Sequence, residues 1–130
     1  MHVSRYFAVK AGKVEAFKTI WRDAYASAKA NAKAEQSHQY AFCFEEREDG
    51  TATALCREAY GDAASVMLHV KNVGRPLGAS LDPSIAELIR LEVHAPASEM
   101  AALKAGTAAI GTQEGAPQYF AIAWGFRNAV

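Results

Sequence analysis

The side chain best suited to acid–base chemistry in this sequence is His69, which lies in a stretch with helical periodicity, residues 63–73. Helix geometry places His69 roughly 100° from the centre of the apolar stripe formed by this stretch, at the edge of that stripe. An imidazole there can take a proton from a substrate, because histidine changes protonation state near neutral pH. The alternative is a structural histidine that hydrogen-bonds a carboxylate or fills the contact between helix and sheet.

Glu58 and Tyr60 are two residues apart in a predicted strand, so their side chains share one face of it. Glu58 is a candidate proton acceptor, and Tyr60 a candidate hydrogen-bond donor to a substrate. The competing interpretation of Glu58 is an ion pair across a strand or a subunit interface. Asn72 follows His69 by three residues and would either orient it or cap the helix end before Gly74.

Two further groups could line a binding site. Glu92 and His94 share the polar face of a predicted strand, where they would line a pocket, lie in solvent or meet a partner subunit. Trp21 and Tyr40, with neighbouring aromatic residues, could form the walls around a flat aromatic substrate. Aromatic residues at these spacings are also typical of a core.

The elements that must position these residues follow from hydrophobic periodicity. Strand, helix, strand, strand, helix, strand, helix and strand are predicted over residues 3–10, 13–34, 38–47, 51–60, 63–73, 86–94, 97–110 and 118–127. Residues 74–85 contain prolines and glycines and are predicted to form a loop. Asp62 is a plausible N-cap of the second helix. The order predicts an α+β domain of the ferredoxin-like split βαβ type, with an antiparallel sheet and helices on one face.

Asp49-Gly50 between two β-rich runs predicts a hairpin. With a two-residue loop, Cys43 faces Cys56, and Tyr40 lies on the opposite face of the sheet from Glu58. A three-residue loop would shift this register. In the two-residue register both faces of the sheet carry apolar side chains, so we expect a homodimer that stacks sheet on sheet.

Composition limits the possible classes of function. The chain has 130 residues, 51% hydrophobic and 22% charged, which predicts one globular domain over residues 1–130 and excludes a disordered chain. A net charge of zero argues against nucleic-acid binding. The absence of an 18-residue apolar run argues against a membrane span, and no apolar signal core follows Met1, so we expect a cytoplasmic protein. Cys43 and Cys56 are too few for a zinc site and are expected to be free thiols.

The segment from Arg57 to Gly74, with its Glu-x-Tyr, the Asp-Ala turn and one helical histidine, resembles the antibiotic-biosynthesis monooxygenase-like group. Residues 6–13, followed by Phe17 and Trp21, are similar to that group's first strand and helix. The resemblance implies a dimeric α/β barrel with a pocket between each sheet and its helices. It is specific for the fold and poorly specific for activity.

The resemblance also implies cofactor-free oxidation of phenols, quinols or anthrones by O2, without a metal or flavin. His69 or Glu58 would remove a proton, and Tyr60 and Asn72 would hold oxygen substituents of the substrate. One alternative is a non-catalytic, structural dimer of the same fold that binds a small apolar ligand or a partner protein. A third is a heme-binding protein that uses His69, although residues 3–10 lack the asparagine of the heme-degrading branch.

Overall fold

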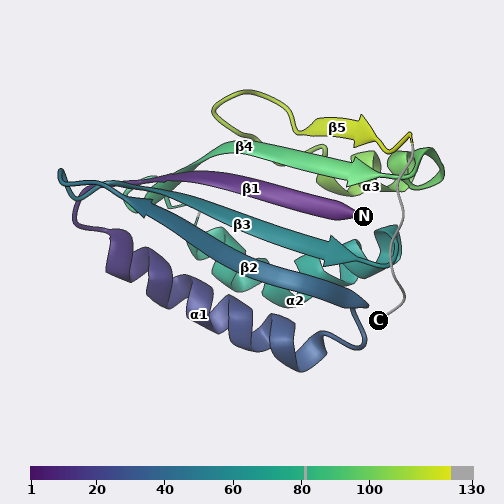
Figure 1. Cartoon of the computed structure of the whole chain (residues 1–130), viewed down its shortest axis with the longest axis horizontal. Coiled ribbons are helices and arrows are strands. Elements are labelled where there is room, and N and C mark those ends of the chain that lie inside the picture. The colour runs from purple at the N-terminus through teal and green to yellow at the C-terminus, as the bar shows by residue number, and fades with distance from the viewer. Residues whose placement is uncertain (81, 124–130) are drawn as a thin grey trace.

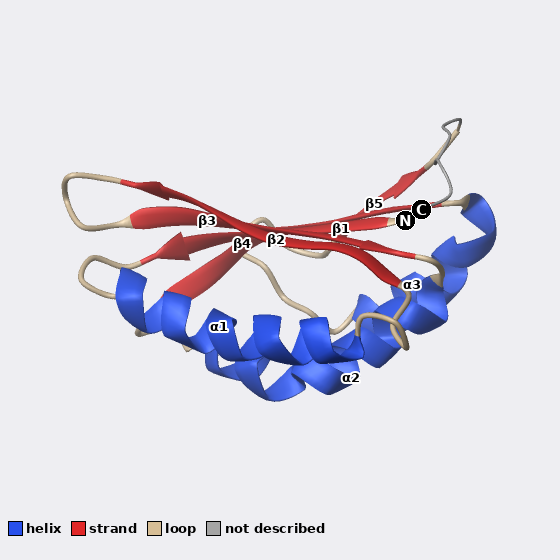
Figure 2. Ribbon diagram, turned by 60° about the horizontal axis from the view of Figure 1, so that its bottom comes forward, coloured by secondary structure: helices blue, strands red, loops and turns tan. Residues whose placement is uncertain are grey.

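The computed structural model describes residues 1–80 and 82–123, and of residues 75–77, 79 and 80 it describes the backbone alone. The elements in chain order are β1 (His2–Val9), α1 (Val14–Asn31), β2 (Ser37–Glu46), β3 (Ala52–Tyr60), α2 (Ala63–Ser80), β4 (Ala86–Ala95), η1 (Ala97–Glu99), α3 (Met100–Thr107) and β5 (Gln118–Ala121), as Figure 1 shows. The strands form one sheet in the order β2-β3-β1-β4-β5. Helices α1 and α2 cover one face of this sheet, and the other face is open (Figure 2). The predicted α+β ferredoxin-like fold is confirmed.

Strands β1 to β4 pair antiparallel, as predicted, but β5 joins β4 in parallel. The alternating pattern of β1 directs Val3, Arg5, Phe7 and Val9 into the protein. Phe7 packs against Phe17 and Trp21 of α1, with ring centroids 5.2 Å and 5.6 Å away. Burying each of these aromatic side chains stabilises the fold by roughly 1.5–3 kcal/mol, which fixes α1 on the sheet.

The register of the β2–β3 hairpin differs from the two-residue-loop prediction. Glu46 pairs with Ala52, and the amide of Arg47 donates to the carbonyl of Thr51 at 2.9 Å, so the loop has three residues. Gly50 adopts a left-handed φ of 78°, the conformation that a three-residue hairpin loop requires. The pairing is shifted by one residue as a result.

The shift changes the neighbours of every residue on β2. Cys43 lies opposite Leu55, whereas Cys56 lies opposite Phe42. Tyr40 pairs with Glu58, so the aromatic side chains of β2 share the helix-covered face with that carboxylate. The expectation that these groups occupy opposite faces was wrong, and the argument for a dimer from two apolar faces no longer stands.

Helix boundaries differ from the prediction in two places. Helix α2 continues to Ser80, so the predicted loop over residues 74–85 was wrong for its first half. Glycine within a helix is disfavoured by about 1 kcal/mol and proline by about 3 kcal/mol, so the local preferences of Gly74, Pro76 and Gly78 did not indicate that the helix continues through them. Helix α1 ends at Asn31, and a series of turns follows it. The last predicted strand is described only to Ala121 as β5, and its residues 124–127 lie outside the described part of the chain.

Candidate functional site

A layer of polar side chains divides the apolar interior in two. One core cluster contains Phe7 and Cys56, and the other contains Val3 and Tyr60. Between them on β1 and β3 lie Arg5 and Glu58, with exposed fractions of 3% and 1%. Burying a charged side chain costs free energy even when it is paired with an opposite charge. A fold that keeps two of them in its interior has a candidate functional site there.

Glu58 is the centre of this layer. Its carboxylate accepts hydrogen bonds from the Arg5 guanidinium, from the Tyr60 hydroxyl at 3.0 Å and from the Cys56 thiol at 3.2 Å. Burial lowers the pKa of Arg5, but the combined attraction of Glu58 and neighbouring groups outweighs burial, so the net pKa lies above its ordinary value. Arg5 therefore stays charged and compensates the charge of Glu58.

His69 reaches the same layer from α2 and is fully buried. Its Nδ1 lies 2.8 Å from the Oε2 of Glu35, a carboxylate that is fully buried too. The amide of Asn72 donates to the other oxygen of Glu35 at 2.7 Å. Glu35 therefore orients the imidazole, and Asn72 orients Glu35.

Glu35 is held in place by the turns between α1 and β2. Its amide donates to the carbonyl of Asn31 at 2.9 Å, and the following residue, Gln36, has a left-handed φ of 43°. A non-glycine residue in that region costs of order 1–3 kcal/mol, and surrounding contacts must stabilise it. The amide of Gly61, next to α2, donates to the carbonyl of Gln36 at 3.1 Å. This contact fixes the turn against the start of α2.

The second nitrogen of His69 has no hydrogen-bond partner among the described residues. His69 Nε2 lies 3.7 Å from the Oε1 of Glu58, beyond hydrogen-bond distance, and the buried hydroxyl of Tyr40 is likewise without a partner. The ring of His69 lies 5.3 Å from that of Tyr40 and 5.2 Å from that of Tyr60. An unsatisfied buried polar atom costs about 1–3 kcal/mol, so these two atoms, like the buried Nε1 of Trp21, are candidates for contact with a ligand or a buried water.

Tyr40, Tyr60 and Cys56 are proton donors in this site. Burial is the largest cause that raises the pKa of each of them, the negative charge of Glu58 raises it further, and the Arg5 guanidinium lowers it in part, so the net pKa lies above its ordinary value. The two phenols and the thiol therefore stay protonated at neutral pH. A role for Cys56 as a thiolate nucleophile is disfavoured.

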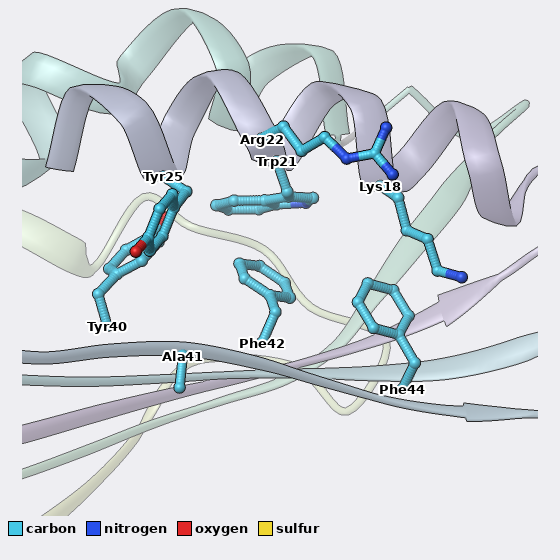
Figure 3. A pocket seen from close by; sticks show the side chains of 8 residues that line it. All are labelled: Lys18, Trp21, Arg22, Tyr25, Tyr40, Ala41, Phe42 and Phe44. Carbon is cyan, nitrogen blue, oxygen red and sulfur yellow. The ribbon is translucent and has the colours of Figure 1, made fainter. Parts of the chain in front are cut away.

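Tyr40 also lines a groove of about 430 Å³ between α1 and the edge strand β2. Helix α1 contributes Lys18, Trp21, Arg22 and Tyr25, and β2 contributes Tyr40, Ala41, Phe42 and Phe44 (Figure 3). The volume is in the range of small-molecule sites. The groove and the polar layer share Tyr40, since its ring contacts those of both Tyr25 and His69.

The structure brings together most of the side chains singled out in the sequence. These are His69, Glu58, Tyr60 and Asn72 in or beside the polar layer, with Trp21 and Tyr40 lining the groove. His94 is separate: it lies on the open face, stacked on Phe120 with ring centroids 4.7 Å apart, among residues lining a second hollow of about 510 Å³. The alternative role of Asn72 as a helix cap was wrong, because α2 continues beyond it.

Sequence reasoning missed Glu35 and Arg5. Glu35 lies between the predicted helix over residues 13–34 and the predicted strand over residues 38–47, where no periodic pattern marks it. Arg5 carried a usable signal, because it is the one charged residue on the strand face that it shares with Val3, Phe7 and Val9. A charge on an otherwise apolar face predicts a buried partner.

The enclosure of His69 bears on the heme alternative. Its Nδ1 binds Glu35, and its Nε2 is enclosed between two tyrosine rings beside Glu58. These surroundings do not fit a histidine that ligates heme iron. Within residues 1–80 and 82–123, no group of three or more His, Cys, Asp or Glu side chains is arranged to hold a metal ion. No described helix is both long and apolar enough to cross a membrane.

Comparison with known proteins gives the fold. No family model matches the chain, and no curated protein matches it. Among solved structures, MupZ from Pseudomonas fluorescens is similar over 98% of this chain and 88% of its own, with a TM-score of 0.79 and 24% identity. A Caulobacter crescentus protein named "putative antibiotic biosynthesis monooxygenase" matches over 65% of this chain and 78% of its own, with a TM-score of 0.44 and 20% identity. The likeness to MupZ shows that the two chains share the ferredoxin-like α+β fold.

Proposed function

We propose that this protein is a cofactor-independent monooxygenase for small aromatic substrates of the phenol, quinol or anthrone type. The observation that carries the proposal is His69, a buried imidazole held at Nδ1 by Glu35 and without a hydrogen bond at Nε2. A base that is oriented by a carboxylate and whose second nitrogen makes no hydrogen bond is suited to general base catalysis once a substrate reaches that nitrogen.

In the proposed reaction a flat substrate binds in the groove and reaches His69 when the side chain of Tyr40 moves aside. His69 Nε2 takes a proton from an acidic C–H or O–H, and the electron pair stays on the substrate. The resulting anion reacts with O2 to form a carbon–oxygen bond and a peroxide. The peroxide takes back the proton from His69, and loss of water leaves a carbonyl group on the substrate.

The other residues of the site have supporting roles. Glu35 keeps the imidazole oriented throughout, and Asn72 positions Glu35. Tyr60 and Tyr40 are protonated phenols that donate hydrogen bonds to oxygen substituents of the substrate. Glu58 is the alternative base, but its pairing with Arg5 makes it less available than His69.

Oxygen uptake by the purified protein tests the proposal against a panel of anthrones, quinols and catechols. We expect uptake to be lost in His69→Ala and reduced in Glu58→Gln. The matched control is His38→Ala, because His38 is an exposed histidine of β2. Circular dichroism shows whether each variant is folded. Full turnover in both site variants would contradict the assignment.

One observation favours a second candidate, a ligand-binding protein without catalysis. His69 and Glu58 are enclosed, so the groove can hold an aromatic molecule without any contact between that molecule and either side chain. A tightly bound small molecule in the purified protein, together with no oxygen uptake across the panel, supports this candidate.

The proposal includes a homodimer formed through the open sheet face. The large apolar side chains of Phe120 and Ile122, 45% and 40% exposed, support it, because a second copy would cover part of this surface. Sedimentation equilibrium tests the dimer, and a monomer at micromolar concentration contradicts it. We place the protein in the cytoplasm, and the two free thiols support this.

A further inference from the structure

The two ends of the groove between α1 and β2 differ in the chemistry of their side chains. Tyr25 and Tyr40 lie at one end of it, and the cationic side chains of Lys18 and Arg22 lie at the other (Figure 3). Between the two ends, Trp21 packs on Phe42 with ring centroids 4.4 Å apart. A planar ring in this groove would therefore have phenols at one end and cations at the other.

Lys18 is already neutralised by the protein. Its ammonium lies 3.0 Å from a carboxylate oxygen of Glu15 and 2.5 Å from one of Glu46. The same ammonium lies over the ring of Phe44, 5.3 Å from its centroid. Lys18 therefore forms part of the wall of the groove and has little capacity left for a ligand.

Arg22 is different. Its guanidinium approaches Glu15 only at 3.9 Å, beyond hydrogen-bond distance, and its side chain is 70% exposed. Guanidinium has five N–H donors in a planar fork that matches the two oxygens of a carboxylate. Within the described residues, Arg22 is therefore the cation of this groove whose donors are available to an anionic group.

We propose that the groove selects planar aromatic molecules that carry a carboxylate, with the ring against the aromatic wall and the carboxylate on Arg22. This inference rests on the proposed function in taking the groove as the substrate site, and it adds the substrate class. The carboxylate sets the orientation of the molecule. The end of the ring remote from Arg22 then faces Tyr40, the residue that contacts His69.

Calorimetric titration with two probes tests the proposal: 2-naphthoate, and 2-naphthamide as its neutral analogue of similar shape. We expect the wild type to bind naphthoate roughly threefold more tightly than naphthamide, as one ion pair at a largely exposed site provides. Arg22→Gln should remove this preference, and Arg22→Lys should keep part of it. Lys29→Gln is the matched control, because it makes the same charge change on the same helix outside the groove.

Equal binding of the two probes, no binding of either, or equal losses in Arg22→Gln and Lys29→Gln would overturn the inference. These outcomes are distinguishable from failure of the proposed function. If naphthoate binding depends on Arg22 and no oxygen uptake is found, the monooxygenase assignment fails and the ligand class stands. If oxygen uptake depends on His69 and the two probes bind equally, the ligand class fails and the monooxygenase assignment stands.

Discussion

Replacement of Arg5 by methionine would leave the carboxylate of Glu58 in the interior without its cation. Both side chains are almost completely buried, at 3% and 1% exposure, so solvent cannot compensate for the loss. The hydrogen bonds from Tyr60 and Cys56 remain, but both donors are neutral. Breaking a buried ion pair by removing one partner costs about 3–5 kcal/mol. Domains are stable by about 5–15 kcal/mol, so Arg5→Met should remove roughly a fifth or more of the total free energy of unfolding.

Urea unfolding followed by circular dichroism measures this loss as a change in the free energy of unfolding. The matched control is Arg47→Met, because Arg47 forms an exposed pair with Glu45 at 3.0 Å and should contribute less than about 1 kcal/mol. The double variant Arg5→Met/Glu58→Gln should recover part of the stability, since it also removes the unpaired charge. A free energy of unfolding for Arg5→Met within about 1 kcal/mol of wild type would refute the reasoning.

Three further predictions concern local features. Asp62→Ala should lose about 1 kcal/mol at neutral pH, because Asp62 caps α2 through the Ser65 amide at 2.8 Å. Hydrogen bonds from the side chain and backbone of Ser65 lower the pKa of Asp62. The stability that the cap contributes is therefore fully present above the pKa of Asp62 in the unfolded chain, and it is lost as pH falls through the lower pKa of the folded protein. The difference in melting temperature between wild type and Asp62→Ala should accordingly shrink as pH falls below the ordinary pKa of aspartate, and a constant difference would contradict the cap. Gly50→Ala should lower the free energy of unfolding in urea by about 1 kcal/mol, because residue 50 has a left-handed φ of 78°. Gly111→Ala is the control and should cause no loss, because there is open space around it. Equal effects of the two substitutions would contradict the turn geometry. Iodoacetamide should label Cys56 only in denaturant, as followed by mass spectrometry, because the thiol is buried and its pKa is raised; rapid native labelling would contradict the burial.

The fold could be predicted from the sequence because periodicity and turn residues are local signals. The alternation on β1 and the apolar stripe of α1 identified the residues by which these two elements meet in the core, such as Phe7, Phe17 and Trp21. The hairpin register could not be settled in this way, since Asp49-Gly50 is compatible with loops of two or three residues. The end of α2 was missed because Gly74, Pro76 and Gly78 locally disfavour a helix, and α2 nevertheless includes them.

The site was predictable only in part. His69 could be identified as a candidate base because it is a polar residue at the edge of an apolar helical stripe. The structure adds the carboxylate that orients it. That partner, Glu35, lies in an irregular turn 34 residues earlier, where no periodicity indicates the direction of a side chain. The pairing of Arg5 with Glu58 depends on β1 lying beside β3, which is a property of the topology.

Proton abstraction by His69 can be measured apart from the oxygen chemistry, by following deuterium exchange into the acidic C–H of an anthrone under anaerobic conditions. We predict that the wild type accelerates this exchange above the buffer rate. His69→Gln should return the exchange to the buffer rate, Glu35→Gln should slow it, and His38→Ala should leave it unchanged. Exchange at the wild-type rate in folded His69→Gln would contradict the central claim that the imidazole oriented by Glu35 is the base.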